Sequence, residues 1–143
     1  MAVTKQKGLQ AEIYVAYLLI QHGFRVLRPF GEDARYDLVS EKRGIFKRIQ
    51  VKHVSLRNGT LEVPLRSANN YQTIYYSPDD IDVIAAYNPE NLKVYFIPRC
   101  AITNRSCLKL RLTDCKNGQR RRVVWAADFE LKFDVLEEQS MPV

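Results

Sequence analysis

The sequence is poor in histidine and cysteine, and it has no long apolar run. Its 143 residues include 2 histidines and 3 cysteines, and no two cysteines are separated by only two residues. Structural zinc sites need such ligands at close spacing, so we expect reduced thiols and no zinc. No apolar run approaches the ~20 residues that cross a bilayer, and the first residues lack the apolar core of a signal peptide. The sequence therefore predicts a cytoplasmic protein with no membrane partner.

Two kinds of catalytic motif are also missing. Neither His22 nor His53 has an obvious partner for a Ser-His-Asp or Cys-His arrangement, which disfavours nucleophilic catalysis of that type. The glycines that follow Lys7 and Arg43 are isolated, so no glycine-rich loop is there to bind phosphate. The chemistry must therefore come from carboxylates, amides and basic residues.

The composition is that of a globular domain with a basic excess. Hydrophobic residues make up 46% of the chain and charged residues 27%. The length suits a single domain that spans residues 1–143, and we find no internal repeat or low-complexity linker. The formal net charge of +6 favours an anionic partner. Nucleic acid is favoured over a membrane because no basic amphipathic helix is evident.

Residues 4–22 are expected to form the first helix, which Gly23 ends. Apolar residues recur there at helical spacing. The apolar stripe predicted to pack on the core carries Leu9, Ile13, Tyr17 and Ile20, and it is widened by Val15, Leu18 and Leu19. The same helix carries Glu12, whose small and apolar neighbours leave two alternatives. Either this carboxylate faces solvent, which the periodicity favours, or it lies at the edge of the buried face and needs a cation or an ion-pair partner.

Two strands joined by a polar turn form the most informative stretch of the chain. We expect the strands at residues 35–39 and 46–53 and the turn at residues 40–44. Alternation along the second strand points Gln50 and Lys52 to one side and Val51 into the core. Asp37 on the first strand then lies near this amide and this ammonium group. Such a polar cluster is either a satisfied surface network or a functional site.

The rest of the chain predicts more strands. They are expected at residues 24–29, 60–63, 81–87, 92–98 and 108–112, with a last short helix at residues 126–132. The strand at residues 60–63 is expected to pair with residues 52–55 and to end at Pro64, which cannot donate to a ladder. Residues 81–87 are nearly all apolar, which suits a strand buried on both faces. We expect Trp125 to anchor the core.

Candidate DNA contacts lie on either side of the strand at residues 60–63. They are Arg57, Arg66, Asn69, Asn70, Tyr71 and Gln72. Asparagine and glutamine can read adenine edges, arginine can read guanine or hold phosphate, and tyrosine can contact backbone or bases. The alternative is a polar surface loop packed by its tyrosines. The nearby Asp79, Asp80 and Asp82 could imitate a metal site, although capping of a turn is the more usual role for the first two.

The order of these residues resembles a known nuclease family. Asp37, followed by Gln50-Val51-Lys52 on the next strand, is similar to the D…(D/E)-x-K signature of the PD-(D/E)XK nuclease superfamily. Residues 7–26 around Glu12 resemble the first helix of archaeal Holliday-junction resolvases. The likeness extends over residues 7–125. Residues 36–38, 49–52, 80–85 and 94–98 are similar to the small bacterial homing endonucleases encoded by group I introns.

This resemblance implies a fold, a site and partners. The implied fold is restriction-endonuclease-like, of the α/β (α+β) class, with a mixed central β-sheet flanked by helices. The implied catalytic residues are Glu12, Asp37, Gln50 and Lys52. Asp37, Glu12 and Gln50 would hold Mg²⁺ or Mn²⁺, and Lys52 would orient the attacking water or offset charge on the phosphate. The implied partners are double-stranded DNA and further copies of the chain, as a dimer or tetramer, because a double-strand cut needs two sites.

Two positions depart from the family pattern. Tyr36 stands where many members have proline, which leaves the neighbouring aspartate unchanged. Gln50 replaces the usual second acid, and a neutral amide is a weaker ligand for a hard cation. The resemblance implies that Glu12 restores the missing charge. The leading interpretation is a Mg²⁺-dependent, sequence-specific homing endonuclease. The alternatives are a Holliday-junction resolvase, a restriction-type endonuclease, or a catalytically silent DNA-binding module of the same fold.

Overall fold

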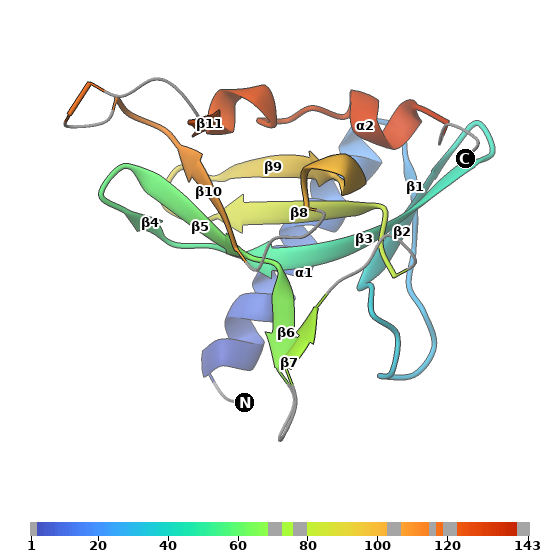
Figure 1. Cartoon of the computed structure of the whole chain (residues 1–143). Coiled ribbons are helices and arrows are strands. Elements are labelled where there is room, and N and C mark those ends of the chain that lie inside the picture. Colours follow the sequence, from blue (N-terminus) through green and yellow to red (C-terminus); the bar gives the residue numbers. More distant parts are fainter. Residues whose placement is uncertain are drawn as a thin grey trace.

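The computed structural model describes residues 3–68, 73–75, 80–102, 107–114, 117–118 and 123–139. At its centre lies a five-stranded sheet in the order β1-β2-β3-β8-β9 (Figure 1). The strands are β1 (Arg25–Leu27), β2 (Leu38–Lys42), β3 (Ile45–His53), β8 (Val83–Asn88) and β9 (Lys93–Pro98). Neighbouring strands are antiparallel except β3 and β8, which are parallel. The predicted mixed central sheet is therefore confirmed.

A second sheet of four strands packs beside the first. Its order is β11-β10-β5-β4, and its strands are β4 (Leu56–Arg57), β5 (Thr60–Pro64), β10 (Cys107–Arg111) and β11 (Val124–Trp125). The expected pairing of residues 60–63 with residues 52–55 is wrong, because β5 pairs with β4 and β10. Lys52 and His53 instead continue β3 and pair with β8. β5 does end at Pro64, as expected.

Short elements complete the chain. The hairpin of β6 (Arg66–Ala68) and β7 (Thr73–Tyr75) projects at the end of the molecule where the first helix begins (Figure 1). The remaining turns of helix are η1 (Arg99–Ala101), η2 (Ala126–Asp128) and α2 (Asp134–Glu137). The helix predicted at residues 126–132 is thus replaced by the single turn η2, and α2 begins later. Trp125 is only half-buried, so its expected role as a core anchor is wrong.

Two apolar clusters cover opposite faces of the central sheet. One lies between the sheet and helix α1 (Val3–Gln21), and it includes Val15 of the helix and Val51 of β3. The other lies between the two sheets, and it includes Ile84 of β8 and Leu61 of β5. Because both faces are covered, β8 is buried along its whole length, as its continuous apolar run predicts.

Helix α1 has the predicted bounds to within one residue, but it packs by only one edge of the predicted apolar stripe. The buried residues are Ala11, Val15 and Leu19. Within the predicted stripe, Val15 and Leu19 are thus buried as expected, whereas its other main residues are exposed, namely Leu9, Ile13, Tyr17 and Ile20. The helix is apolar on two opposite faces, so periodicity alone could not tell which face the sheet would cover. Within the described residues, no helix is long and apolar enough to cross a membrane.

The hairpin of β2 and β3 is tighter than predicted. β2 begins at Leu38 rather than at residue 35, and β3 begins at Ile45. Only Arg43 and Gly44 separate Lys42 from Ile45, its partner in the ladder. Both have positive φ, 55° and 80°, which is the conformation of a two-residue hairpin turn that matches the strand twist. Asp37 therefore stands just before β2 and not within it.

Candidate active site

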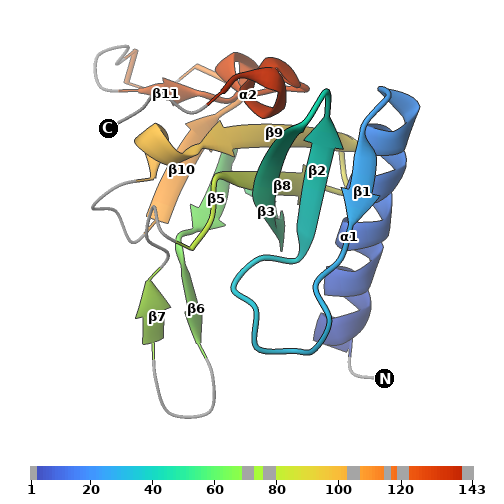
Figure 2. The same ribbon diagram turned by 90° about the vertical axis from the view of Figure 1, so that its right-hand side faces the viewer.

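Helix α1, the start of β2 and the end of β3 meet at one end of the central sheet. Figure 2 shows the N-terminal half of α1 at the same end as the connection that leads into β2 and as the tip of β3. β2 and β3 are antiparallel, so the first residue of one lies near the last residues of the other. This arrangement brings the predicted residues Glu12, Asp37, Gln50 and Lys52 to a common region.

Two hydrogen bonds to β3 fix Asp37 beside Gln50. The backbone N–H of Asp37 donates to the carbonyl oxygen of Ile49, at 2.9 Å. The N–H of Val51 donates to Oδ2 of Asp37, also at 2.9 Å. The carboxylate thus takes the place of a backbone acceptor in the ladder, and its position follows from the position of β3.

The environment of Asp37 opposes its negative charge. Burial raises the pKa of Asp37, and the Val51 hydrogen bond and the positive charges of Lys52 and Arg28 only partly offset that effect. The net result is a pKa above the ordinary value of an aspartate. A carboxylate in this state gains more than an exposed one when a further cation binds beside it.

Glu12 is the second carboxylate of the region. Burial raises its pKa, the charge of Asp37 raises it further, and Arg28, at 3.8 Å, lowers it. Its side chain is 22% exposed, so the solvent-facing position that periodicity favours is wrong. Glu12 lies at the edge of the buried face, as the alternative expected. The negative charge of Asp37 therefore hinders the ionisation of Glu12.

Gln50 and Lys52 lie on the other side of β3 from Val51, as alternation predicts. Gln50 pairs with Ile84 and Lys52 with Ala86, and both of these β8 residues belong to the cluster between the two sheets. Gln50 and Lys52 are half-buried. The charge of Lys52 lowers the pKa of Asp37, so the ammonium group lies within electrostatic reach of that carboxylate.

The donor set of this region fits a hard divalent cation. Glu12 and Asp37 offer carboxylate oxygens, and Gln50 offers an amide oxygen, which are ligands that Mg²⁺ and Mn²⁺ accept. Across the described ranges, no group of three or more His, Cys, Asp and Glu side chains could hold a metal ion. A cation beside the two carboxylates would offset the burial that raises the pKa of both.

The three aspartates at residues 79–82 do not share one environment. Asp82 accepts hydrogen bonds from the backbone N–H and the guanidinium of Arg48, at 2.8 and 3.1 Å, and it also pairs with Arg99. Asp80 lies 3.8 Å from Arg35. Asp79 lies outside the described residues. Asp80 and Asp82 therefore each form ion pairs with arginines. Through Arg48 and Arg99, Asp82 connects the start of β8 to β3 and to the end of β9.

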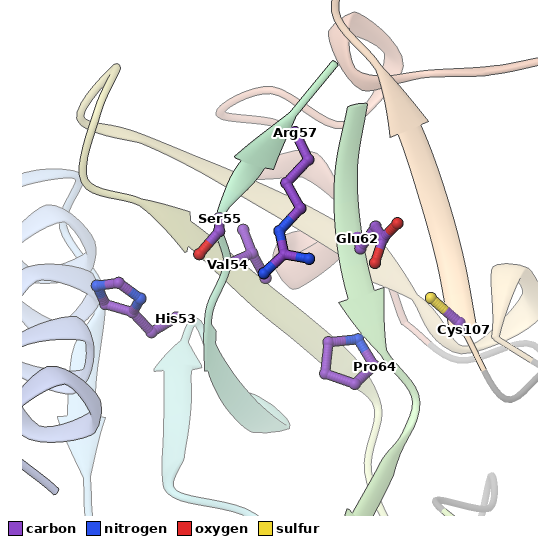
Figure 3. Close-up of a pocket in the computed structure, with 7 residues that line it drawn as sticks. All are labelled: His53, Val54, Ser55, Arg57, Glu62, Pro64 and Cys107. Atoms are coloured by element: carbon purple, nitrogen blue, oxygen red, sulfur yellow. The ribbon is translucent and has the colours of Figure 1, made fainter. Parts of the chain in front are cut away.

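A pocket that sequence reasoning missed lies just beyond Lys52. Its volume is about 430 Å³ (Figure 3). It is lined by His53, Val54, Ser55, Arg57, Glu62, Pro64 and Cys107. Burial and the charge of Lys7 lower the pKa of His53. The sequence gives no signal for this pocket, because the unpredicted pairing of β5 with β10 is what brings Glu62 and Cys107 to one wall.

The predicted DNA contacts are only partly placed. Arg57 is exposed and lines the pocket beside His53. Arg66 begins β6, and its side chain is outside the description. Asn69, Asn70, Tyr71 and Gln72 lie between β6 and β7, outside the described residues.

Comparison with known proteins places this architecture in a family. Residues 2–132 match the PD-(D/E)XK endonuclease family. The chain belongs to the PD-(D/E)XK endonuclease family. Its fold is also similar to that of the bacterial homing endonuclease I-Ssp6803I, with 27% sequence identity and a TM-score of 0.76 over 94% of this chain and 93% of that one. Among curated proteins, no sequence matches this chain.

A second solved structure shows how far this PD-(D/E)XK fold extends. Hjc from Archaeoglobus fulgidus, a Holliday junction resolvase of an archaeal hyperthermophile, has a TM-score of 0.54 and 16% identity. The match covers 94% of this chain and 99% of that one. At this identity the likeness concerns the fold alone. The expected restriction-endonuclease-like fold is confirmed, and the family makes a DNA endonuclease the general function.

Proposed function

We propose that this member of the PD-(D/E)XK family is a Mg²⁺-dependent endonuclease that cuts double-stranded DNA at a specific sequence, as a homing endonuclease does. The observation that carries the proposal is the placement of two carboxylates, Glu12 and Asp37, within electrostatic reach of each other at the end of β3, where Lys52 also lies within electrostatic reach of Asp37. Support for the homing type comes from the 27% identity with I-Ssp6803I over nearly the whole of both chains.

Each residue of the region has a distinct role in this proposal. Asp37 and Glu12 would hold Mg²⁺ or Mn²⁺, and Gln50 would add its amide oxygen. When bound, such an ion lowers the pKa of a water molecule and offsets charge on the phosphate. The Val51 N–H keeps the Asp37 carboxylate in one orientation, because it holds Oδ2 at 2.9 Å. Lys52 would donate to a phosphate oxygen and stabilise the charge that develops there.

Basic residues around the carboxylates support a DNA partner. The charge of Arg28 lowers the pKa of both Glu12 and Asp37, and the charge of Lys7 lowers the pKa of His53. Arg57 lines the same pocket as His53. The β6–β7 hairpin projects at the same end of the molecule (Figure 2). A two-stranded ribbon can enter the major groove. We therefore place the DNA along this end, with Arg57, Arg66, Asn69, Asn70, Tyr71 and Gln72 as the proposed contacts.

A homo-oligomer, dimer or tetramer, completes the proposal. One site of this kind hydrolyses one phosphodiester, and the two strands of a duplex run in opposite directions. Two copies related by a two-fold axis match the symmetry of the duplex.

Substitution of Lys52 tests the proposal. Lys52→Met is expected to bind DNA nearly as well as the wild type and to cut it about 10²- to 10³-fold more slowly, because an ammonium that stabilises developing charge is lost. The assay measures cleavage of a randomised double-stranded DNA library in Mg²⁺, followed by sequencing of the cut ends. A four-way junction in the same assay tests the resolvase alternative.

Lys42→Met is the matched control for this assay. Lys42 ends β2, at the far end of the strand from Asp37, and pairs with Glu137. The same chemical change there should leave cutting intact. Equal rates for Lys52→Met and the wild type would refute the role of Lys52, and a wild type that cuts neither substrate would leave a DNA-binding module.

A further inference from the structure

The outer face of α1 is apolar and faces away from the protein. We define this outer face by Leu9, Ile13, Tyr17 and Ile20, which are 38%, 61%, 58% and 62% exposed. Their spacing of four, four and three residues puts them on one side of the helix. That side is opposite to the side of Ala11, Val15 and Leu19, which is fully buried against the sheet.

An exposed apolar helix face of this kind is expected to be covered by another surface. A helix that is apolar all round is normally buried all round, and monomeric proteins rarely expose a contiguous apolar stripe of this kind. The described residues of this chain cover only the sheet side of α1. A helix of 19 residues is about 28 Å long, which is the diameter of a small domain. The outer face is therefore long enough to form the centre of an interface of about 800 Å² per partner.

We propose that the outer face of α1 binds the same face of a second copy of this chain. The chain carries a net charge of +6, so most pairings of two copies bring like charges together. The outer face largely avoids that cost, because its four residues are uncharged and its exposed polar neighbours are Gln6, Gln10 and Gln21, with Lys5 the exposed charge beside its N-terminal end. An uncharged apolar stripe is complementary to itself, as an isologous interface requires.

The distribution of charge along α1 selects the antiparallel arrangement. Lys5 and Lys7 lie near its start, and its last turn has no basic residue. Parallel helices would bring the lysines of both copies together, whereas antiparallel helices separate them by the length of the helix. The middle of the outer face lies near residue 15, so Ile13 of one copy meets Tyr17 of the other.

This pairing also determines the distance between the two candidate active sites, a consequence that rests on the proposed function. Glu12 directly precedes Ile13 on the same helix. With a rise of 1.5 Å per residue and helix axes 8–10 Å apart, the two Glu12 positions lie about 15 Å from each other. Two sites at this spacing can act on the two strands of one duplex.

The test is the molar mass of the full chain in solution, measured by light scattering and sedimentation equilibrium. The wild type is expected to be a dimer or a tetramer. Ile13→Glu places a charge in the interface twice, once from each copy, so self-association should weaken about 100-fold or more and the mass should fall to half. Phe46→Glu is the matched control, because Phe46 is 59% exposed on β3 and outside the outer face. It should keep the wild-type mass.

A second variant tests the antiparallel arrangement and guards against misfolding. Ile13→Glu combined with Tyr17→Lys places opposite charges across the antiparallel pair and should restore the wild-type mass. A monomeric wild type, or an Ile13→Glu variant that keeps the wild-type mass, would overturn the proposal. A double variant that stays monomeric while its circular dichroism is native would overturn the antiparallel arrangement.

Failure of this proposal and failure of the proposed function give different results. If the wild type associates, Ile13→Glu does not, and neither cuts a randomised DNA library in Mg²⁺, the interface stands and the nuclease proposal fails. If Ile13→Glu cuts both strands as fast as the wild type while both have the wild-type mass, the interface fails and the nuclease proposal stands.

Discussion

Asp37 and Asp82 both accept a hydrogen bond from β3, one from each edge of the strand, but their carboxylates lie in opposite electrostatic surroundings. Each carboxylate accepts a backbone N–H of β3, Asp37 from Val51 at 2.9 Å and Asp82 from Arg48 at 2.8 Å. Asp82 also pairs with the guanidinium groups of Arg48 and Arg99. Asp37 has instead a second carboxylate, Glu12, within electrostatic reach.

The surroundings move the two pKa values in opposite directions. Burial raises the pKa of Asp82, but the hydrogen bonds and charges of Arg48 and Arg99 outweigh burial and hold it below the ordinary value. Burial also raises the pKa of Asp37, and there the favourable contacts do not outweigh it. The ionised form of Asp82 is therefore stabilised by the fold, whereas the ionised form of Asp37 is destabilised by it. A destabilised carboxylate of this kind is expected of a residue that binds a cation.

The largest expected effect is that of Asp37→Asn on cutting. The amide oxygen can still accept the Val51 N–H, but the charge that would hold Mg²⁺ is lost. We expect the cleavage rate to fall by at least about 10³-fold, since the metal supplies several kcal/mol of charge stabilisation. The free energy of unfolding should stay equal or rise, because an unfavourable charge is removed. A variant that unfolds more easily than the wild type would show that the charge of Asp37, like that of Asp82, stabilises the fold.

Asp82→Asn is expected to show the reverse pattern. The substitution removes the charge that pairs with Arg48 and Arg99, in a site where the carboxylate is only 13% exposed. The free energy of unfolding should fall by about 2 kcal/mol. Urea denaturation measures it, and cutting below the transition, per folded molecule, should stay near the wild-type rate. A loss of metal binding with unchanged stability would show that Asp82 belongs to the site.

Gln50→Glu adds a third carboxylate beside Asp37 and Glu12. The new charge supplies a stronger ligand for a hard cation. We expect the affinity for Mg²⁺ to rise about 10-fold, a change of 1.4 kcal/mol. Gln50→Ala is the matched control and should weaken binding. An affinity that falls in Gln50→Glu would mean that residue 50 does not face the metal.

The smallest expected change is in how the free energy of unfolding of the two aspartate variants depends on pH. Because the folded pKa of Asp37 is raised, the folded state binds more protons than the unfolded state just above the ordinary pKa, and this contribution to stability is lost as pH rises. Because the folded pKa of Asp82 is lowered, its contribution is present above the ordinary pKa and is lost as pH falls. Between about pH 3 and 6, the stability advantage of Asp37→Asn over the wild type should therefore grow with pH. The disadvantage of Asp82→Asn should grow with pH too, and denaturation at several pH values measures both.

Local patterns in the sequence predict much of the fold. α1, β8 and β9 follow from apolar runs and turn residues that act within a few positions. Alternation along β3 correctly places Val51 in the core and Gln50 and Lys52 on the other face. Proximity of Asp37 to β3 likewise follows from one hairpin.

What could not be predicted depends on contacts between distant segments. Nothing local tells that residues 60–64 pair with residues 107–111, so the second sheet and the pocket at His53 were missed. α1 has two apolar faces, and only the sheet decides which is covered. The position of Glu12 could not be predicted for the same reason. The helix face that buries Val15 brings Glu12 within electrostatic reach of Asp37.

We propose that Asp37 holds a metal ion, whereas Asp82 stabilises the fold through its ion pairs with Arg48 and Arg99. Isothermal titration calorimetry with Mg²⁺ and Mn²⁺ on the wild type, Asp37→Asn and Asp82→Asn distinguishes these two roles. The wild type and Asp82→Asn should bind the ion with similar affinity, and Asp37→Asn should not bind it. Equal binding by Asp37→Asn and the wild type would show that Asp37 is not a metal ligand.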